Sequence, residues 1–255
     1  MSDQSPFGGA PSSANSSRPA LPGGSVVVRP TQDELLDAIA SDLYMHAAAC
    51  VREFGDFHLA LSVWPEAEAL YLRLLYDPRF RDLPWKRTHL WLVEENFSQN
   101  RFEVLEQAIV LQSDIPQQQV HRPAQTQDYQ AELQESLGWR EKGHDRLDFA
   151  LLPLLERGQT HGSRSAGPAA ALVETRPGQV LMTRRLLEAT RFIAIAALGS
   201  GSVEGVREIV TRGTRRSGAG SDRLFADEIS PLGGELRWYV DQSACRSETG
   251  REGEG

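Results

Sequence analysis

The sequence predicts an α/β protein in three layers, in which a mostly parallel twisted sheet lies between helices on both faces. Short apolar runs that could form buried strands recur along the chain, and the clearest is residues 88–93 (Thr-His-Leu-Trp-Leu-Val). Segments with a helical apolar period separate these runs, an alternation typical of parallel sheets covered on both sides. The chain has 255 residues, 40% of them apolar, which is enough for one large domain with a sizeable core.

The first half of the chain opens with a predicted strand at Ser25–Arg29, which Pro30 closes. Thr31, with Glu34 three residues later, forms a capping box for a long helix. One face of that helix carries Leu35, Leu36, Ile39, Leu43 and Ala47. Buried strands are then predicted at residues 58–61 and 88–93, and helices at residues 66–76, 100–111 and 125–137.

The second half continues the alternation. The apolar runs at residues 147–152 and 191–198 are predicted as strands, and residues 183–190, 203–211 and 234–244 as helices. The last helix is predicted to face inward with Leu236, Tyr239 and Val240. Residues 170–173 and 179–182 are expected to pair as short strands around the Arg-Pro-Gly turn at residues 176–178.

The ends of the chain differ from its middle in composition. Residues 1–24 are rich in Ser, Pro and Gly and lack an apolar run, so we expect a disordered tail and no signal peptide. Residues 246–255 are expected to form a second disordered tail. This leaves residues 25–245 as a single predicted domain.

Charge and composition exclude several classes of protein. A formal net charge of −8 argues against nucleic-acid binding, which selects basic faces. No run approaches the ~20 apolar residues of a membrane span. Cys50 and Cys245 lie far apart, which predicts no disulfide framework and fits a reducing cytoplasm. His46 and Cys50 share a helix face but lack a third ligand, so we expect no metal and no cofactor.

The predicted loop after residues 58–61 has the layout that α/β proteins use to hold phosphate, without the usual residues. Ligands of such sheets bind beyond the carboxyl ends of the strands. Anion capture there needs small residues whose backbone N–H groups can approach the ligand. The loop instead reads Ser62, Val63, Trp64, Pro65, and Pro65 has no N–H to donate. Glu66 and Glu68 follow, and their charges would repel a phosphate.

Several landmarks, taken in order, resemble the 6-phosphogluconolactonases, within the glucosamine-6-phosphate isomerase-like fold group. The resemblance runs from about residue 26 to residue 244. Residues 61–62 and 69–71 flank the place where the family has Ser-Gly-Gly-Ser-Thr-Pro. The acids Glu94 and Glu95 stand where the family has Asp-Glu-Arg, and residues 147–152 lead into its Gly-x-Gly-x-Asp-Gly-His-Thr loop. Residues 236–241 resemble its closing helix.

That resemblance implies a sugar phosphate held by N–H groups and cations, and a histidine base that activates water against a lactone. Here the base position is Gln159, followed by the matching Thr160, and glutamine cannot titrate. The other departures are Asn96 and Gln179 for two arginines, Ser202 near a lysine, and residues 153–155 (Pro-Leu-Leu) for the Gly-x-Gly turn.

Three functional hypotheses follow. The first is a 6-phosphogluconolactonase-like protein of the pentose phosphate pathway type that has lost hydrolysis and acts as a binding or assembly subunit. Family association suggests glucose-6-phosphate dehydrogenase as its partner. The second is an active lactonase that hydrolyses 6-phosphoglucono-lactone with His161 as base and Arg157 or Arg164 on the phosphate. The third is a cleft adapted to an uncharged, apolar ligand between Trp64 and Phe97.

Individual side chains leave alternatives open. His161 is a candidate catalytic base, or else a surface histidine of a Gly/Ser loop. Glu94 and Glu95 are a surviving acid pair for proton transfer, or else solvated charges at a strand end. The degenerate cleft positions expected to lie together are Ser62, Trp64, Glu94, Glu95, Gln159 and Thr160.

Overall fold

The structure is a computed structural model, and it describes residues 19–123, 129–138, 146–164, 171–199, 201–212 and 223–245. Residues 1–18 and 246–255, which hold most of both predicted tails, lie outside the described residues. No helix in the described part of the chain combines the length and apolar character needed to cross a bilayer.

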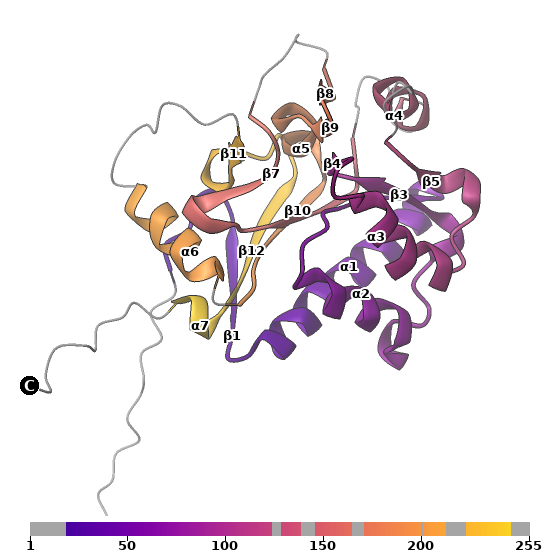
Figure 1. Cartoon of the computed structure of the whole chain (residues 1–255). Coiled ribbons are helices and arrows are strands. Elements are labelled where there is room, and N and C mark those ends of the chain that lie inside the picture. The colour runs from indigo at the N-terminus through magenta and orange to yellow at the C-terminus, as the bar shows by residue number, and fades with distance from the viewer. Residues whose placement is uncertain are drawn as a thin grey trace, which may run out of the picture.

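A parallel sheet runs through the middle of the protein in the strand order β1–β12–β10–β6–β2–β3–β5 (Figure 1). Every neighbouring pair in it is parallel. Its strands are β1 (Ser25–Arg29), β2 (Phe57–Leu61), β3 (Thr88–Leu92), β5 (Val120–His121), β6 (Phe149–Pro153), β10 (Phe192–Ala197) and β12 (Glu235–Asp241).

Helices cover both faces of this sheet, which confirms the predicted three-layer α/β fold (Figure 1). On one face lie α1 (Gln32–Phe54), α2 (Ala67–Tyr76) and α3 (Arg101–Ala108), and on the other α4 (Tyr129–Leu137), α5 (Arg184–Ala189), α6 (Gly201–Arg212) and the short α7 (Gln242–Cys245). Alternation along each strand feeds both cores: Leu59 and Leu61 join the first and Ala60 the second. Thr31 caps α1 as predicted, because its side chain accepts the Glu34 N–H at 3.2 Å.

Two small antiparallel sheets lie outside the central one. One has the order β4–β9–β8, with β4 (Glu94–Asn96), β9 (Gln179–Met182) and β8 (Val173–Arg176), and the other pairs β7 (Gln159–Ser163) with β11 (Arg223–Phe225). The short 3₁₀ turns are Pro78–Phe80, Trp85–Arg87, Val110–Gln112, Gln117–Gln119, Glu156–Gly158 and Ala226–Glu228.

The predicted hairpin exists, but its first strand is shifted. The strand expected at residues 170–173 is β8, which begins at Val173 and ends at Arg176. Arg176 pairs with Gln179, so two residues make the turn, and Gly178 supplies its positive φ of 75°. A two-residue turn fixes the register, and it therefore extends the pairing back only to Val173.

The predicted helix at residues 234–244 is wrong. These residues form β12, in the interior of the sheet between β1 and β10, and only α7 at their end is helical. Leu236, Trp238 and Val240 pack into the second core while Tyr239 packs into the first, which is the two-residue period of a strand. The apolar residues also have spacings of three and four, which fit a helix equally well. The segment is a strand because it pairs with β1 on one side and β10 on the other.

Candidate functional site

A cavity of about 1000 Å³ opens beyond the carboxyl ends of β2 and β6, between α2 and α3. This is the edge where ligands of parallel sheets bind. Carbon-rich side chains dominate its walls, namely Val63, Trp64, Pro65, Leu72, Tyr76, Val104, Ala108 and Leu155. Its polar lining residues include Glu68, Gln99, Arg101, Glu103 and His161.

The β2–α2 turn lies where a phosphate-binding loop would be, and two of its backbone N–H groups are already hydrogen-bonded within the protein. The Ser62 N–H donates to the Leu151 carbonyl at 3.2 Å, and the Ala67 N–H donates to the Trp64 carbonyl at 3.0 Å. The Ser62 carbonyl accepts the Tyr71 hydroxyl, whose pKa burial raises. Pro65 has no N–H. Ser62 and Ala67 therefore offer no spare backbone donor to an anion, and Pro65 has none to offer.

Acidic groups also stand at the places where a phosphate would need cations. Glu68 lines the cavity. The Glu66 carboxylate lies about 4.0 Å from the point where a Cβ on Gly199 would be, at the end of β10. The Gly199 N–H donates to Asp241 at 3.0 Å. Ser202, near the family's lysine position, is buried with its hydroxyl 3.0 Å from the Leu198 carbonyl.

Glu95 is a helix cap. Its two oxygens accept the backbone N–H groups of Arg101 and Phe102, each at 2.9 Å, at the start of α3. A carboxylate is favourable there because the N-terminal end of a helix is positive. The glutamate is only 2% exposed, so its interpretation as a solvated charge is wrong.

Glu94 lies behind two cavity-lining residues, Arg101 and His161, and joins the elements that carry them. One oxygen accepts the Arg101 Nη1–H at 2.8 Å, and the other accepts the Gly162 N–H at 3.2 Å. Its exposure of 4% makes this a buried ion pair rather than a solvated strand end. The pair ties β4, α3 and β7 to one another.

His161 lies in β7 and lines the cavity. It is 2% exposed, so the surface-loop interpretation is wrong. Gln159, at the other end of the register shift in β7, is not among the described residues that line the cavity. Thr160 is buried and donates to the Pro153 carbonyl at 2.7 Å.

The Nε2 atom of His161 faces a cation. It lies 3.3 Å from Arg101 Nη1. A guanidinium only donates, so Nε2 is the acceptor and its lone pair is directed at Arg101. This is the lone pair that would have to take a proton from water in general-base catalysis.

The remaining predicted residues are placed away from the cavity. Arg164 pairs with Glu228 at 2.8 Å, and neither it nor Arg157 is among the described residues that line the cavity. Phe97 packs against the second core and is not among the described residues that line the cavity. Trp64 does line it, so the predicted pairing of Trp64 and Phe97 across a cleft is wrong. Gln179 pairs with Asn96 across the β4–β9 ladder.

Arg101 is the functional residue that sequence reasoning missed. It begins α3, five residues after Asn96, the position of the family's arginine. The signal was available in part: Arg101 is a cation in the first turn of a helix that follows two acids. Its contact with His161 spans 60 residues of sequence, and no local pattern encodes it.

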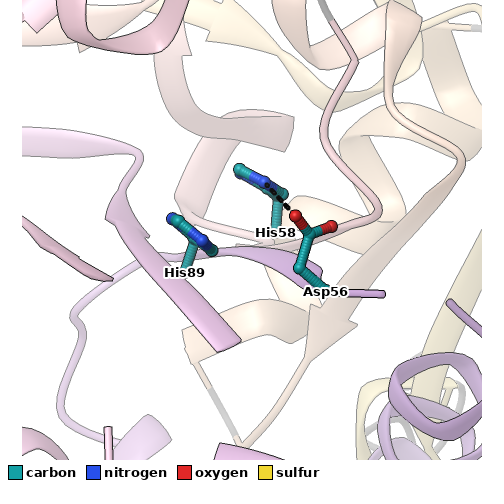
Figure 2. A group of neighbouring side chains, drawn as sticks. All are labelled: Asp56, His58 and His89. Atoms are coloured by element: carbon teal, nitrogen blue, oxygen red, sulfur yellow. Dashed lines mark ion pairs between the residues drawn. The ribbon is translucent and has the colours of Figure 1, made fainter. Parts of the chain in front are cut away.

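A second group of polar side chains lies at the opposite edge, where β2 and β3 begin. Figure 2 shows Asp56 pointing at His58, with His89 beside them, and these ligand atoms lie within 4.8 Å of one another. The His58 and His89 rings are stacked at 4.4 Å and 10°, so their in-plane lone pairs run parallel and do not converge on an ion. Trp91 Nε1–H donates to His58 Nδ1 at 3.1 Å, which leaves the proton of neutral His58 on Nε2.

The same stack continues through His121. His89 Nδ1 lies 3.0 Å from His121 Nε2, and His121 Nδ1 lies 2.7 Å from Glu132. Trp91 stacks on His121 at 3.6 Å. These contacts fit two hydrogen-bonded aromatic layers, and we assign no metal to them. His46 packs against Phe149 and Phe192, and burial lowers its pKa.

Known proteins resemble this chain in sequence. The family described as glucosamine-6-phosphate isomerases/6-phosphogluconolactonase matches residues 30–219. The GDH/6PGL endoplasmic bifunctional protein of Homo sapiens is 26% identical over 243 residues, and that of Oryctolagus cuniculus is 25% identical over 235 residues. The matches cover 86% and 83% of this chain, but the chain spans only 30% and 29% of those relatives.

Solved structures agree in fold. The 6-phosphogluconolactonase from Leishmania guyanensis has a TM-score of 0.68 and 16% identity, over 89% of this chain and 100% of that one. The devB protein has a TM-score of 0.67 and 23% identity, over 86% and 97% of the two chains. A monomeric glucosamine-6-phosphate deaminase has a TM-score of 0.64 and 16% identity, over 86% and 98%.

Proposed function

From the premise that this chain belongs to the glucosamine-6-phosphate isomerase/6-phosphogluconolactonase family, we propose that it is a 6-phosphogluconolactonase-like member without lactone hydrolysis, acting as a binding or assembly subunit. Fold membership alone does not carry this proposal, since function resides in the site. The observation that carries it is the row Glu94–Arg101–His161, in which the histidine lone pair is directed at a guanidinium.

The contact between His161 and Arg101 opposes general-base catalysis. A guanidinium only donates, so Arg101 cannot accept a proton from water or from His161. A lost general base costs ~10²–10⁴ in rate. Gln159, at the family's base position, cannot substitute for it.

Substrate binding is weakened independently. A carboxylate about 5 Å from a phosphate charge repels it by roughly 3 kcal/mol at an effective dielectric constant of 20. Glu66 and Glu68 both stand at the turn that would hold the phosphate. The one guanidinium among the described residues that line the cavity, Arg101, is already neutralised by Glu94.

A dehydrogenase is the partner that we propose. The curated relatives carry GDH and 6PGL in one bifunctional protein, which supports an association of this chain with a separate glucose-6-phosphate dehydrogenase. The proposed compartment is the cytoplasm, and Cys50 and Cys245, which form no disulfide among the described residues, fit a reducing environment. Size-exclusion chromatography of the two purified proteins, alone and mixed, tests the association, and unchanged elution of the mixture would count against it.

An active lactonase is the second candidate, and the burial of His161 beside the cavity favours it. Hydrolysis of 6-phosphoglucono-lactone decides between the two. We expect the wild-type protein to leave the spontaneous rate unchanged and His161→Ala to behave identically. Enzyme-like turnover that His161→Ala abolishes would establish the second candidate instead.

A further inference from the structure

The cavity has features of a small-molecule site that a spent sugar-phosphate cleft does not require. Its volume of about 1000 Å³ is at the upper end of the range for ligand pockets. Leu72, Tyr76 and Val104 line it and yet remain 47%, 62% and 50% exposed. Large apolar side chains gathered at an open cavity are typical of a binding surface.

The charges around the cavity select against anions. Glu68 and Glu103 line it, and its guanidinium is paired with a buried glutamate. An anionic ligand would meet carboxylates without a free countercharge. An uncharged ligand meets no such repulsion, and its binding would bury the apolar side chains that line the cavity.

Arg101 offers a ligand in the cavity a specific polar contact. Arg101 lines the cavity with its side chain 13% exposed. Its Nη1 faces Glu94 and His161, and its Nε donates to Gln99 at 3.0 Å. Its Nη2 has no partner among the described residues, so two N–H donors remain for an acceptor. A carbonyl oxygen is an acceptor without charge and matches this group.

We propose that the cavity binds an uncharged, largely apolar molecule that carries a carbonyl group. Its apolar body lies against Trp64, Leu72 and Val104, and its carbonyl oxygen accepts from Arg101 Nη2. This inference rests on the proposed function in one respect, namely that the cleft no longer serves a sugar phosphate.

The fluorescent ketone prodan tests the proposal, since it is uncharged, apolar and shifts its emission to the blue in a dry site. We expect saturable binding with a blue shift to the full chain. Leu72→Glu, a change at an exposed position, should weaken binding at least about tenfold by placing a charge in the apolar wall. Val210→Glu is the matched control, because Val210 is 40% exposed on α6 and does not line the cavity.

The carbonyl contact has its own variant. The double variant Glu94→Gln/Arg101→Met removes the guanidinium without leaving a buried unpaired carboxylate. It should weaken prodan about tenfold, which is the loss expected for a hydrogen bond to a charged group. N-phenyl-1-naphthylamine, an uncharged compound of similar shape without a carbonyl, should bind the wild-type and double-variant proteins equally.

Absent binding, equal loss in Leu72→Glu and Val210→Glu, or tighter binding of anionic anilinonaphthalene sulfonate would overturn the proposal. So would a dimer that Leu72→Glu dissociates, because the groove would then join two copies of the chain. Lactone hydrolysis is measured on the same samples, so that failure of the proposed function and failure of this inference can be told apart. Turnover refutes the proposed loss of hydrolysis, whereas missing prodan binding refutes only this inference.

Discussion

The ion pair between Glu94 and Arg101 makes a quantitative prediction for the substitution Arg101→Met. The pair is 2.8 Å long, and its side chains are 5% and 13% exposed. At an effective dielectric constant of 20, two charges at that distance attract by about 6 kcal/mol. Removing Arg101 leaves the buried Glu94 carboxylate with the Gly162 N–H as its one remaining hydrogen bond among the described residues. Breaking a buried pair in this way costs about 3–5 kcal/mol.

Urea unfolding at pH 7 measures the effect. We expect Arg101→Met to lower the free energy of unfolding by about 3–5 kcal/mol, and Glu94→Gln/Arg101→Met to recover most of that loss because no charge remains buried. Arg81→Met, at an exposed arginine, is the control and should change little. A single variant within about 1 kcal/mol of wild type, or a double variant no better than the single one, would refute the reasoning.

The other predictions concern the two edges of the sheet. Burial, with the nearby His89 and His58, lowers the pKa of His121 to about 3. The unfolded chain therefore takes up this proton first as the pH falls below about 6.5, and stability is lost between there and pH 3, by about 2 kcal/mol at pH 5. Unfolding midpoints at pH 7 and pH 5 should differ less in His121→Gln than in wild type, and an unchanged difference would contradict this. Gly205→Ala should destabilise by about 1–3 kcal/mol in thermal unfolding, because its Cβ would lie 2.4 Å from the Leu155 carbonyl oxygen; Arg207→Ala on the same helix is the control, and equal effects would argue against the clash.

The layers of the fold could be predicted because burial on both sheet faces leaves a mark in local sequence. Residues 90–93 (Leu-Trp-Leu-Val), for example, are apolar throughout, which is typical of strands covered on both sides. The segment at residues 234–244 failed because its apolar residues fit both periods, and only its position between β1 and β10 makes it a strand. Local sequence does not contain that position.

The sequence was enough to predict which phosphate-binding residues the site lacks. It was not enough to predict where His161 and Arg101 lie. The substitutions at Val63, Trp64 and Pro65 are visible in the sequence because each has a direct consequence for phosphate binding. The burial of His161 was not visible, since its Gly-rich surroundings are typical of a loop and its strand partner β11 lies some 60 residues later. Arg101 acquires its role only when β4, α3 and β7 meet, and that contact depends on the tertiary fold.

The central claim is that a sugar phosphate does not bind in a cleft whose turn carries Val63, Trp64 and Pro65 and whose walls are apolar and acidic. Thermal unfolding in the presence of 6-phosphogluconate tests it most directly. A ligand at a hundredfold excess over its Kd stabilises a protein by about 2.7 kcal/mol. We predict no shift of the unfolding temperature at millimolar 6-phosphogluconate. A saturable rise that Glu68→Gln increases would contradict the claim.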